Sequence, residues 1–128
     1  MGQLSNYLEN ALINATLRGT AYTSPATVYL ALYTSDPTDA DTGTEVSGGA
    51  YARQSIAFGA PSNGVATNSA NVNFPQATAN WGTVSHIGIR DASTAGNLLY
   101  YAPLTTARSI LTGDTLSFLT GQVSVTLD

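Results

Sequence analysis

The sequence predicts a mainly β fold: a single-domain antiparallel β-sandwich, similar to a jelly roll, with one N-terminal α-helix. Charged residues make up only 9% of the 128 residues, whereas helix bundles carry many Glu and Lys on their exposed faces. In their place stand 18 Thr, 12 Ser, 9 Asn and 12 Gly, which suit strands and turns. Apolar residues follow helical spacing in only one segment, near the N-terminus.

The helix is predicted over residues 4–17 (LSNYLENALINATL). Ser5 or Asn6 can cap its N-terminus, and Gly19 stands where a left-handed glycine often ends a helix. One apolar stripe follows i, i+4 spacing and consists of Leu4, Leu8, Leu12 and Ala15, with Tyr7 and Ala11 beside it. Ile13 and Leu17 fall on roughly the opposite side. A loop of the same chain or another subunit must therefore cover them, and both alternatives stay open.

The β-sandwich is predicted over residues 27–127, and the whole chain, 1–128, is predicted to be one domain. Residues 27–34 (TVYLALYT) are apolar on both faces and predict a buried central strand. The pairs Asn63-Gly64 and Gly113-Asp114 predict hairpin turns. Further strands are expected at 50–59, 65–74, 83–89, 97–102, 109–112, 115–119 and 122–127, with a long polar loop at 35–49.

The charge composition argues against nucleic acid and anionic membranes as partners. The chain has no Lys, four scattered Arg residues and a net charge of −4, so it offers no basic patch for phosphates. No apolar stretch approaches the length of a membrane span, and the first twelve residues lack the features of a secretory signal. Without Cys, disulfides, thiolate nucleophiles and Cys-based metal sites are excluded.

No motif in the sequence points to catalysis. His86, the single His, lies in the middle of a predicted strand on one face with Gly88 and Arg90, so a structural or interface role is expected. No nucleophile elbow, phosphate-binding loop or metal-binding His pair occurs. We therefore expect a protein that is not an enzyme and has no cofactor.

The acidic segment 36–45 is the best candidate for a metal site. Its four carboxylates could supply oxygen ligands to a Ca²⁺ ion, although the spacing is not that of an EF-hand and a solvated loop with turn-forming Asp is the simpler interpretation. These candidate ligands are Asp36, Asp39, Asp41 and Glu45. Arg53 and Arg90 are expected to pair with Asp36, Asp91 or backbone carbonyls, as forks that order a loop.

The surface expected from this composition suits contact with other proteins. Hydroxyl, amide and aromatic groups lose less on burial than long charged side chains do, and aromatic residues are enriched at interfaces. The candidate interface residues are Ile13, Leu17, Tyr22, Tyr51, Arg53, Tyr100 and Tyr101. Self-association through the helix or an aromatic strand face, giving a homo-oligomer, is the expected use of this surface.

Several ordered blocks resemble a family of small virion proteins of tailed bacteriophages. The most specific blocks are YLENAL at 7–12, GGAYAR at 48–53 and WGTVSHIGI at 81–89, and the likeness covers nearly the whole chain. Members of this family are described as tail-fibre, capsid-accessory or structural proteins. The resemblance implies a part of the virion, made in the host cytoplasm, with no enzymatic activity and no catalytic residues to carry over.

Charge and size favour the head over the tail as the expected location. An acidic, Lys-free protein is repelled by packaged DNA and suits the outer capsid surface, as a cement or decoration protein that bridges subunits of the major capsid protein. The alternative is a tail component, either a fibre or baseplate-associated adaptor or a receptor-binding module, in which Tyr22, Tyr51, Tyr100 and Tyr101 would stack on host polysaccharide.

Overall fold

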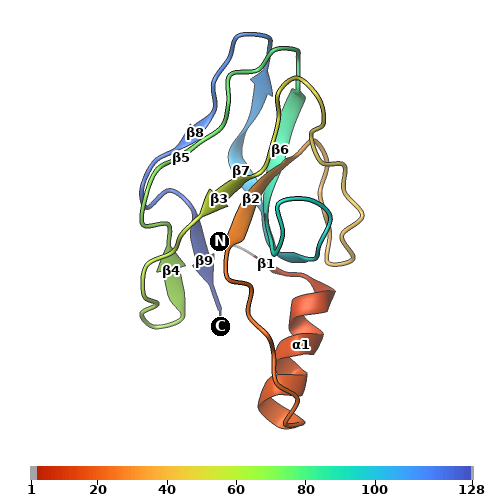
Figure 1. Cartoon of the computed structure of the whole chain (residues 1–128), viewed down its shortest axis with the longest axis vertical. Helices are drawn as coiled ribbons and strands as arrows, with labels where there is room; N and C mark the ends of the chain where they lie inside the picture. The colour runs from red at the N-terminus through yellow and green to blue at the C-terminus, as the bar shows by residue number, and fades with distance from the viewer. Residues whose placement is uncertain (1–2, 128) are drawn as a thin grey trace.

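The computed structural model describes residues 3–127, and these fold as one helix and a set of short antiparallel strands (Figure 1). The predicted mainly β class with a single N-terminal helix is confirmed. Residues 1, 2 and 128 of the predicted domain lie outside the described part of the chain. The elements are β1 (Gln3–Leu4), α1 (Asn6–Leu17), β2 (Val28–Tyr33), β3 (Gln54–Ile56), β4 (Val65–Thr67), β5 (Val72–Asn73), β6 (Gly82–Arg90), β7 (Leu98–Ile110), β8 (Ser117–Phe118) and β9 (Ser124–Thr126).

The larger layer is a five-stranded sheet in the order β1-β7-β6-β2-β3. β2 lies inside it, and its side chains alternate between two buried faces, as the sequence predicted. Leu30 and Leu32 enter the main core, whereas Ala31 and Tyr33 belong to a smaller cluster on the opposite face. Both faces of this sheet are therefore covered, and the cover on the second face consists mostly of loops.

The second layer arises because one long antiparallel ribbon folds back on itself. Pairing continues from Ile87↔Ala102 in the large sheet to Val72↔Phe118 and then Val65↔Thr126 in the two small sheets. The ribbon turns near Trp81, whose backbone N donates to the Ile110 carbonyl at 2.9 Å. Figure 1 shows β5–β8 and β4–β9 lying beside the large sheet after this turn. The main core forms between the two halves of the ribbon.

Aromatic residues fill the core at the turn of the ribbon. Trp81 packs edge-on against Tyr51 and Phe74, with ring centroids 5.6 and 6.5 Å apart. Its indole nitrogen donates to the Gly49 carbonyl at 2.8 Å, so the buried polar atom is satisfied. The loop that follows the acidic segment is thereby joined to the core.

Two predicted strands are shorter or interrupted in the structure. The predicted strand at 50–59 is reduced to β3, and the one at 65–74 is interrupted at Asn68. Asn68 is buried, accepts from Val123 N at 2.9 Å, and donates to the carbonyls of Ala70 and Leu119. The Asn68 side chain thus bonds to backbone groups that would otherwise pair with the backbone of a neighbouring strand.

One predicted hairpin is confirmed and one is wrong. Asn63 and Gly64 have φ of 53° and 79° and join Ser62 to Val65 by reciprocal backbone hydrogen bonds, as in a type I′ turn. Gly113-Asp114 also lies in a turn, but its flanking segments do not pair with each other. They pair with residues 72–83, because they are one side of the long ribbon.

The helix is attached to the sheet mainly at its N-terminal end. Ser5 caps it by accepting from Leu8 N at 3.2 Å and also donates its hydroxyl hydrogen to the Leu98 carbonyl. Leu8 is the one fully buried residue of α1, whereas Ile13 and Leu17 are 53% and 79% exposed. No segment within residues 3–127 covers these two side chains. The helix formed by residues 3–127 lacks the length and apolar character that crossing a membrane requires.

Candidate functional site

Two loops cover the second face of the large sheet and form the most elaborate polar site in the described chain. We call residues 34–45, between β2 and β3, the acidic loop, and residues 91–97, between β6 and β7, the β6–β7 loop. Beneath them lie the buried side chains of Ala31, Tyr33, Leu98 and Tyr101. Gly88 is required here, because a Cβ atom at this position would come within 2.7 Å of the Tyr33 ring.

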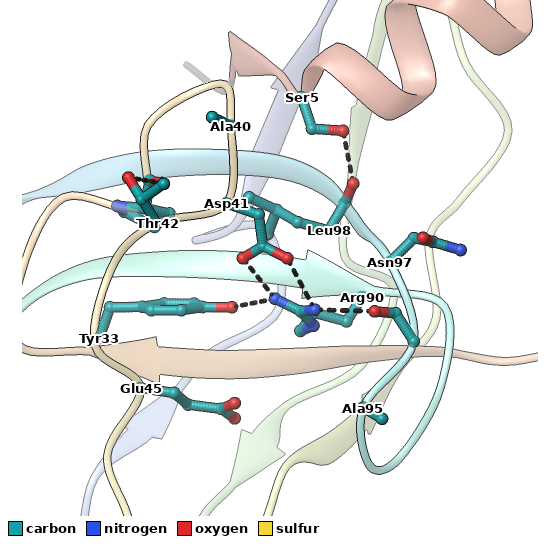
Figure 2. A network of polar contacts seen from close by, with 12 residues as sticks. Ser5, Tyr33, Ala40, Asp41, Thr42, Glu45, Arg90, Ala95, Asn97 and Leu98 are labelled. Carbon is teal, nitrogen blue, oxygen red and sulfur yellow. Dashed lines mark hydrogen bonds and ion pairs between the residues drawn. The ribbon is translucent and has the colours of Figure 1, made fainter.

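Arg90, at the end of β6, is a buried clamp between these two loops (Figure 2). Its Nη1 and Nη2 donate to the Asp41 carboxylate at 2.8 and 2.9 Å in a bidentate pair. Nη1 also donates to the Tyr33 hydroxyl, and Nη2 donates to the Gly96 carbonyl, both at 2.9 Å. The side chain is only 8% exposed, so these contacts replace its hydration. One guanidinium thus joins the acidic loop, the β6–β7 loop and β2.

Burial and hydrogen bonding act in opposite directions on the Arg90 charge. Burial lowers the pKa of Arg90, but the hydrogen bonds to Asp41 and Tyr33 outweigh it, so the net pKa is raised and the charge is retained. For Tyr33, burial raises the pKa more strongly than Arg90 lowers it, so the phenol stays protonated. Nε of Arg90 is buried and has no hydrogen-bond partner among residues 3–127. The clamp is therefore charged but not fully satisfied.

Arg53 forms a second clamp on the same two loops. Its Nε and Nη2 donate to the Glu45 carboxylate, both at 2.8 Å, in another bidentate pair. Its Nη1 donates to the carbonyls of Ala92 and Ala95, also at 2.8 Å. The sequence predicted arginine forks that order loops, and this is confirmed. The partners are carbonyls together with Asp41 and Glu45, so the predicted carboxylates, Asp36 and Asp91, were wrong.

The clamped loops hold backbone conformations that non-glycine residues avoid. Thr38 and Asp41 in the acidic loop and Ala95 in the β6–β7 loop have φ of 60°, 58° and 51°. A left-handed conformation costs about 1–2 kcal/mol per residue. Asp41 and Ala95 are also residues whose oxygens accept from Arg90 and Arg53. The clamps therefore stabilise loop conformations that the local sequence alone does not favour.

Glu45 is also bonded to a tyrosine that reaches into the core. The Tyr51 hydroxyl donates to Glu45 Oε2 at 2.6 Å and accepts from Leu32 N at 3.1 Å. Burial alone would raise the pKa of Glu45, but the hydrogen bonds from Arg53 and Tyr51 outweigh it and hold the pKa below its usual range. Burial and the Glu45 hydrogen bond both raise the pKa of Tyr51. The pair is thus ionised at Glu45 and neutral at Tyr51.

The acidic loop also caps the helix. The Asp39 carbonyl accepts from Asn6 N at 2.8 Å, and the Asp39 carboxylate accepts a hydrogen bond from the Tyr101 hydroxyl. Burial and this bond raise the pKa of Tyr101. Because Arg90 holds the same loop through Asp41, the clamp helps to position the first turn of α1.

The four candidate calcium ligands do not converge on one point. Asp36 faces His86, with 3.9 Å between Oδ1 and Nε2, while Asp39, Asp41 and Glu45 bind Tyr101, Arg90 and the Arg53–Tyr51 pair respectively. Residues 3–127 contain no group of three or more His, Cys, Asp or Glu placed to hold a metal ion. The acidic loop directs its carboxylates to separate protein partners, and binding of Ca²⁺ stays a prediction.

The candidate interface residues fall into two groups. Ile13 and Leu17 are exposed, whereas Tyr22, Tyr51, Arg53 and Tyr100 are half-buried and Tyr101 is buried within this chain. Tyr51 belongs to the core aromatic cluster, and Tyr101 to the cluster beneath the clamped loops. The structure therefore does not gather the four tyrosines into one exposed aromatic face.

The model of one protein family, described as Podophage GP4 fiber I protein gp80, matches residues 3–126. The chain belongs to this family. It is therefore a structural component of a phage virion, in agreement with the resemblance seen in the sequence. The fibre description of the gp80 family backs the tail alternative better than the capsid-cement interpretation. No curated protein matches the chain.

Replacing Arg90 with Lys should destabilise this gp80-family chain. Lys retains the charge but cannot make the bidentate pair with Asp41 while also reaching Tyr33 and Gly96. Because hydrogen bonds to charged groups contribute about 1.5–3 kcal/mol each, we expect a loss of about 3 kcal/mol in the free energy of unfolding, measured by urea denaturation. Arg18→Lys is the matched control, because the Arg18 side chain is exposed and makes no hydrogen bond or ion pair within residues 3–127. Equal stability of the two variants would contradict the clamp.

Replacing Glu45 with Gln should remove part of the acid sensitivity of folding. Because the folded-state pKa of Glu45 is lowered, its contribution to stability is fully present above the unfolded pKa of about 4.3 and is lost as the pH falls through the folded pKa. We expect the wild-type advantage over Glu45→Gln to be largest above about pH 5 and to shrink below about pH 4. Urea denaturation of dilute protein at several pH values measures it, with the exposed Glu9→Gln as control. A difference independent of pH would show that Glu45 is not held ionised by its partners.

Proposed function

We propose that this chain is a component of the podophage tail fibre, which acts by assembly with other virion proteins and catalyses no reaction. The observation that carries the proposal is the match of residues 3–126 to a fibre protein family. The match extends from β1 to β9, so it includes the helix, the clamped loops and the folded ribbon.

The distribution of charge supports a role in assembly. The clamps use Arg53 and Arg90 with Asp41 and Glu45 to order the chain itself. What remains exposed is rich in hydroxyl and amide groups, which lose little when another protein covers them. Ile13 and Leu17 add exposed apolar area, which another protein can cover.

The structure supports a small, rigid module with one projecting contact element. α1 extends from the end of the large sheet (Figure 1), and its position is fixed by Ser5 and by the acidic loop. A helix that is held at one end and exposes Ile13 and Leu17 on its outer face is suited to binding in a groove of a neighbour. We include homo-oligomer formation and contact with other fibre or tail proteins in the proposal.

The number of copies in each virion tests the location. A fibre component should be present in tens of copies or fewer, in a multiple of the tail symmetry, whereas a protein that covers the capsid should reach several hundred. Quantitative mass spectrometry of purified virions, normalised to the major capsid protein, measures this number. Several hundred copies would contradict the fibre proposal and support a capsid cement or decoration protein.

A further inference from the structure

The outer face of α1 lacks a partner within its own chain. Among the strands, α1 contacts β1 and β7, and Leu8 is its single fully buried residue. A 12-residue helix is marginally stable in water and usually depends on packing of its apolar face. Since Ile13 and Leu17 are 53% and 79% exposed, much of the apolar surface of α1 is available to another molecule.

The sandwich is closed along one side and open along the other. On the closed side, Gly59 N donates to the Thr67 carbonyl and Ser69 N donates to the Ala57 carbonyl, which joins the segment after β3 to β4. On the open side, a groove of about 380 Å³ lies between β7 and the β8–β9 segment. We call it the β7–β8 groove.

An irregularity in β7 accompanies the open side. Between the pairs Val84↔Arg108 and His86↔Pro103, residues 104–107 of β7 lie opposite Ser85 alone. Such a bulge bends this part of β7 and prevents its edge from pairing regularly with another strand. The groove is therefore better suited to an inserted side-chain ridge than to an added strand.

The lining of the groove combines apolar side chains with uncharged Thr, Ser and Gln side chains and carries one positive charge. Its apolar part includes Ile87, Leu104 and Phe118. Arg108 is the one charged side chain among its lining residues, and it makes no hydrogen bond or ion pair within residues 3–127. An occupant should therefore combine aliphatic side chains with a carboxylate.

The exposed face of α1 has this combination. Glu9, Ile13 and Leu17 are spaced four residues apart and so lie along one face of the helix. Glu9 is the one acidic residue of α1 and makes no ion pair within residues 3–127. At about 30 Å³ per water-sized group, the groove has room for about a dozen heavy atoms, enough for the side chains of Ile13 and Leu17.

We propose that α1 of one copy binds in the β7–β8 groove of the next copy. Ile13 and Leu17 then pack against Leu104 and Phe118, and Glu9 pairs with Arg108. This inference rests on the proposed fibre function and names the partner of its projecting helix. Because the two surfaces differ, the contact is head-to-tail and builds either a closed ring or a continuing filament.

Charge reversal tests the pairing directly. In sedimentation velocity of the purified full chain, Glu9→Arg and Arg108→Glu should each lower the association constant by about tenfold or more. The double variant Glu9→Arg/Arg108→Glu should recover association to within about threefold of wild type. Leu17→Asp should abolish association in every background, and circular dichroism checks that each variant remains folded.

A second double variant supplies a matched control. Glu9→Arg/Arg18→Glu has the same net charge but reverses an arginine outside the groove, so it should not recover association. Recovery by this variant would overturn the proposal in favour of direct pairing between two α1 helices. A wild-type chain that stays monomeric, or a failure of the Arg108 double variant to recover, would also overturn it. The copy number in the virion is measured separately, so the fibre function and the helix–groove contact can fail independently.

Discussion

The conformation of this protein depends on a positive charge buried at the end of its central sheet. Arg90 lies where β6 ends and is almost removed from water, so it must be surrounded by acceptors. Those acceptors come from β2, the acidic loop and the β6–β7 loop. The need to satisfy one guanidinium therefore fixes the relative positions of three segments that are distant in sequence. Arg53 repeats the arrangement nearby, with Glu45 as its carboxylate and two carbonyls of the β6–β7 loop.

This constraint extends to the surface proposed for assembly. The acidic loop held by Arg90 also accepts a hydrogen bond from the first residue of α1 through Asp39. The core between the two halves of the ribbon is aliphatic and aromatic, and Asn68 is a buried polar residue beside it. The clamps and the core thus hold one end of α1 and leave Ile13 and Leu17 outside. A rigid module with an exposed helix follows from where the few charges are placed.

Local patterns in the sequence predicted the elements that depend on neighbouring residues. The 27–34 strand, the Asn63-Gly64 turn and a cap at Ser5 or Asn6 follow from periodicity and turn chemistry, and the structure has all three, with Ser5 as the cap. The sequence left open whether a loop of the same chain or another subunit covers Ile13 and Leu17, and no loop within residues 3–127 does so. The interruption at Asn68 was missed because its side chain bonds to Val123 and Leu119, far along the chain. The scarcity of charged residues predicted that Arg53 and Arg90 would form forks. It did not predict Asp41 and Glu45 as their partners, because the fold of the acidic loop brings these two carboxylates to the arginines. No sequence pattern pointed to Arg108, because the groove that it lines forms only when β7 and the β8–β9 segment come together in the fold.

The most direct test of the clamp is the exchange of the Asn6 amide hydrogen, which donates to Asp39. Native-state hydrogen exchange followed by NMR compares this amide in wild type and in Arg90→Lys. If Arg90 orders the loop that caps α1, exchange at Asn6 and at Thr42 becomes faster in the variant, while the amides of Asn68 and Val123 in the ribbon keep their protection. Unchanged exchange at Asn6 would contradict the account, because the helix would then be held independently of the buried arginine.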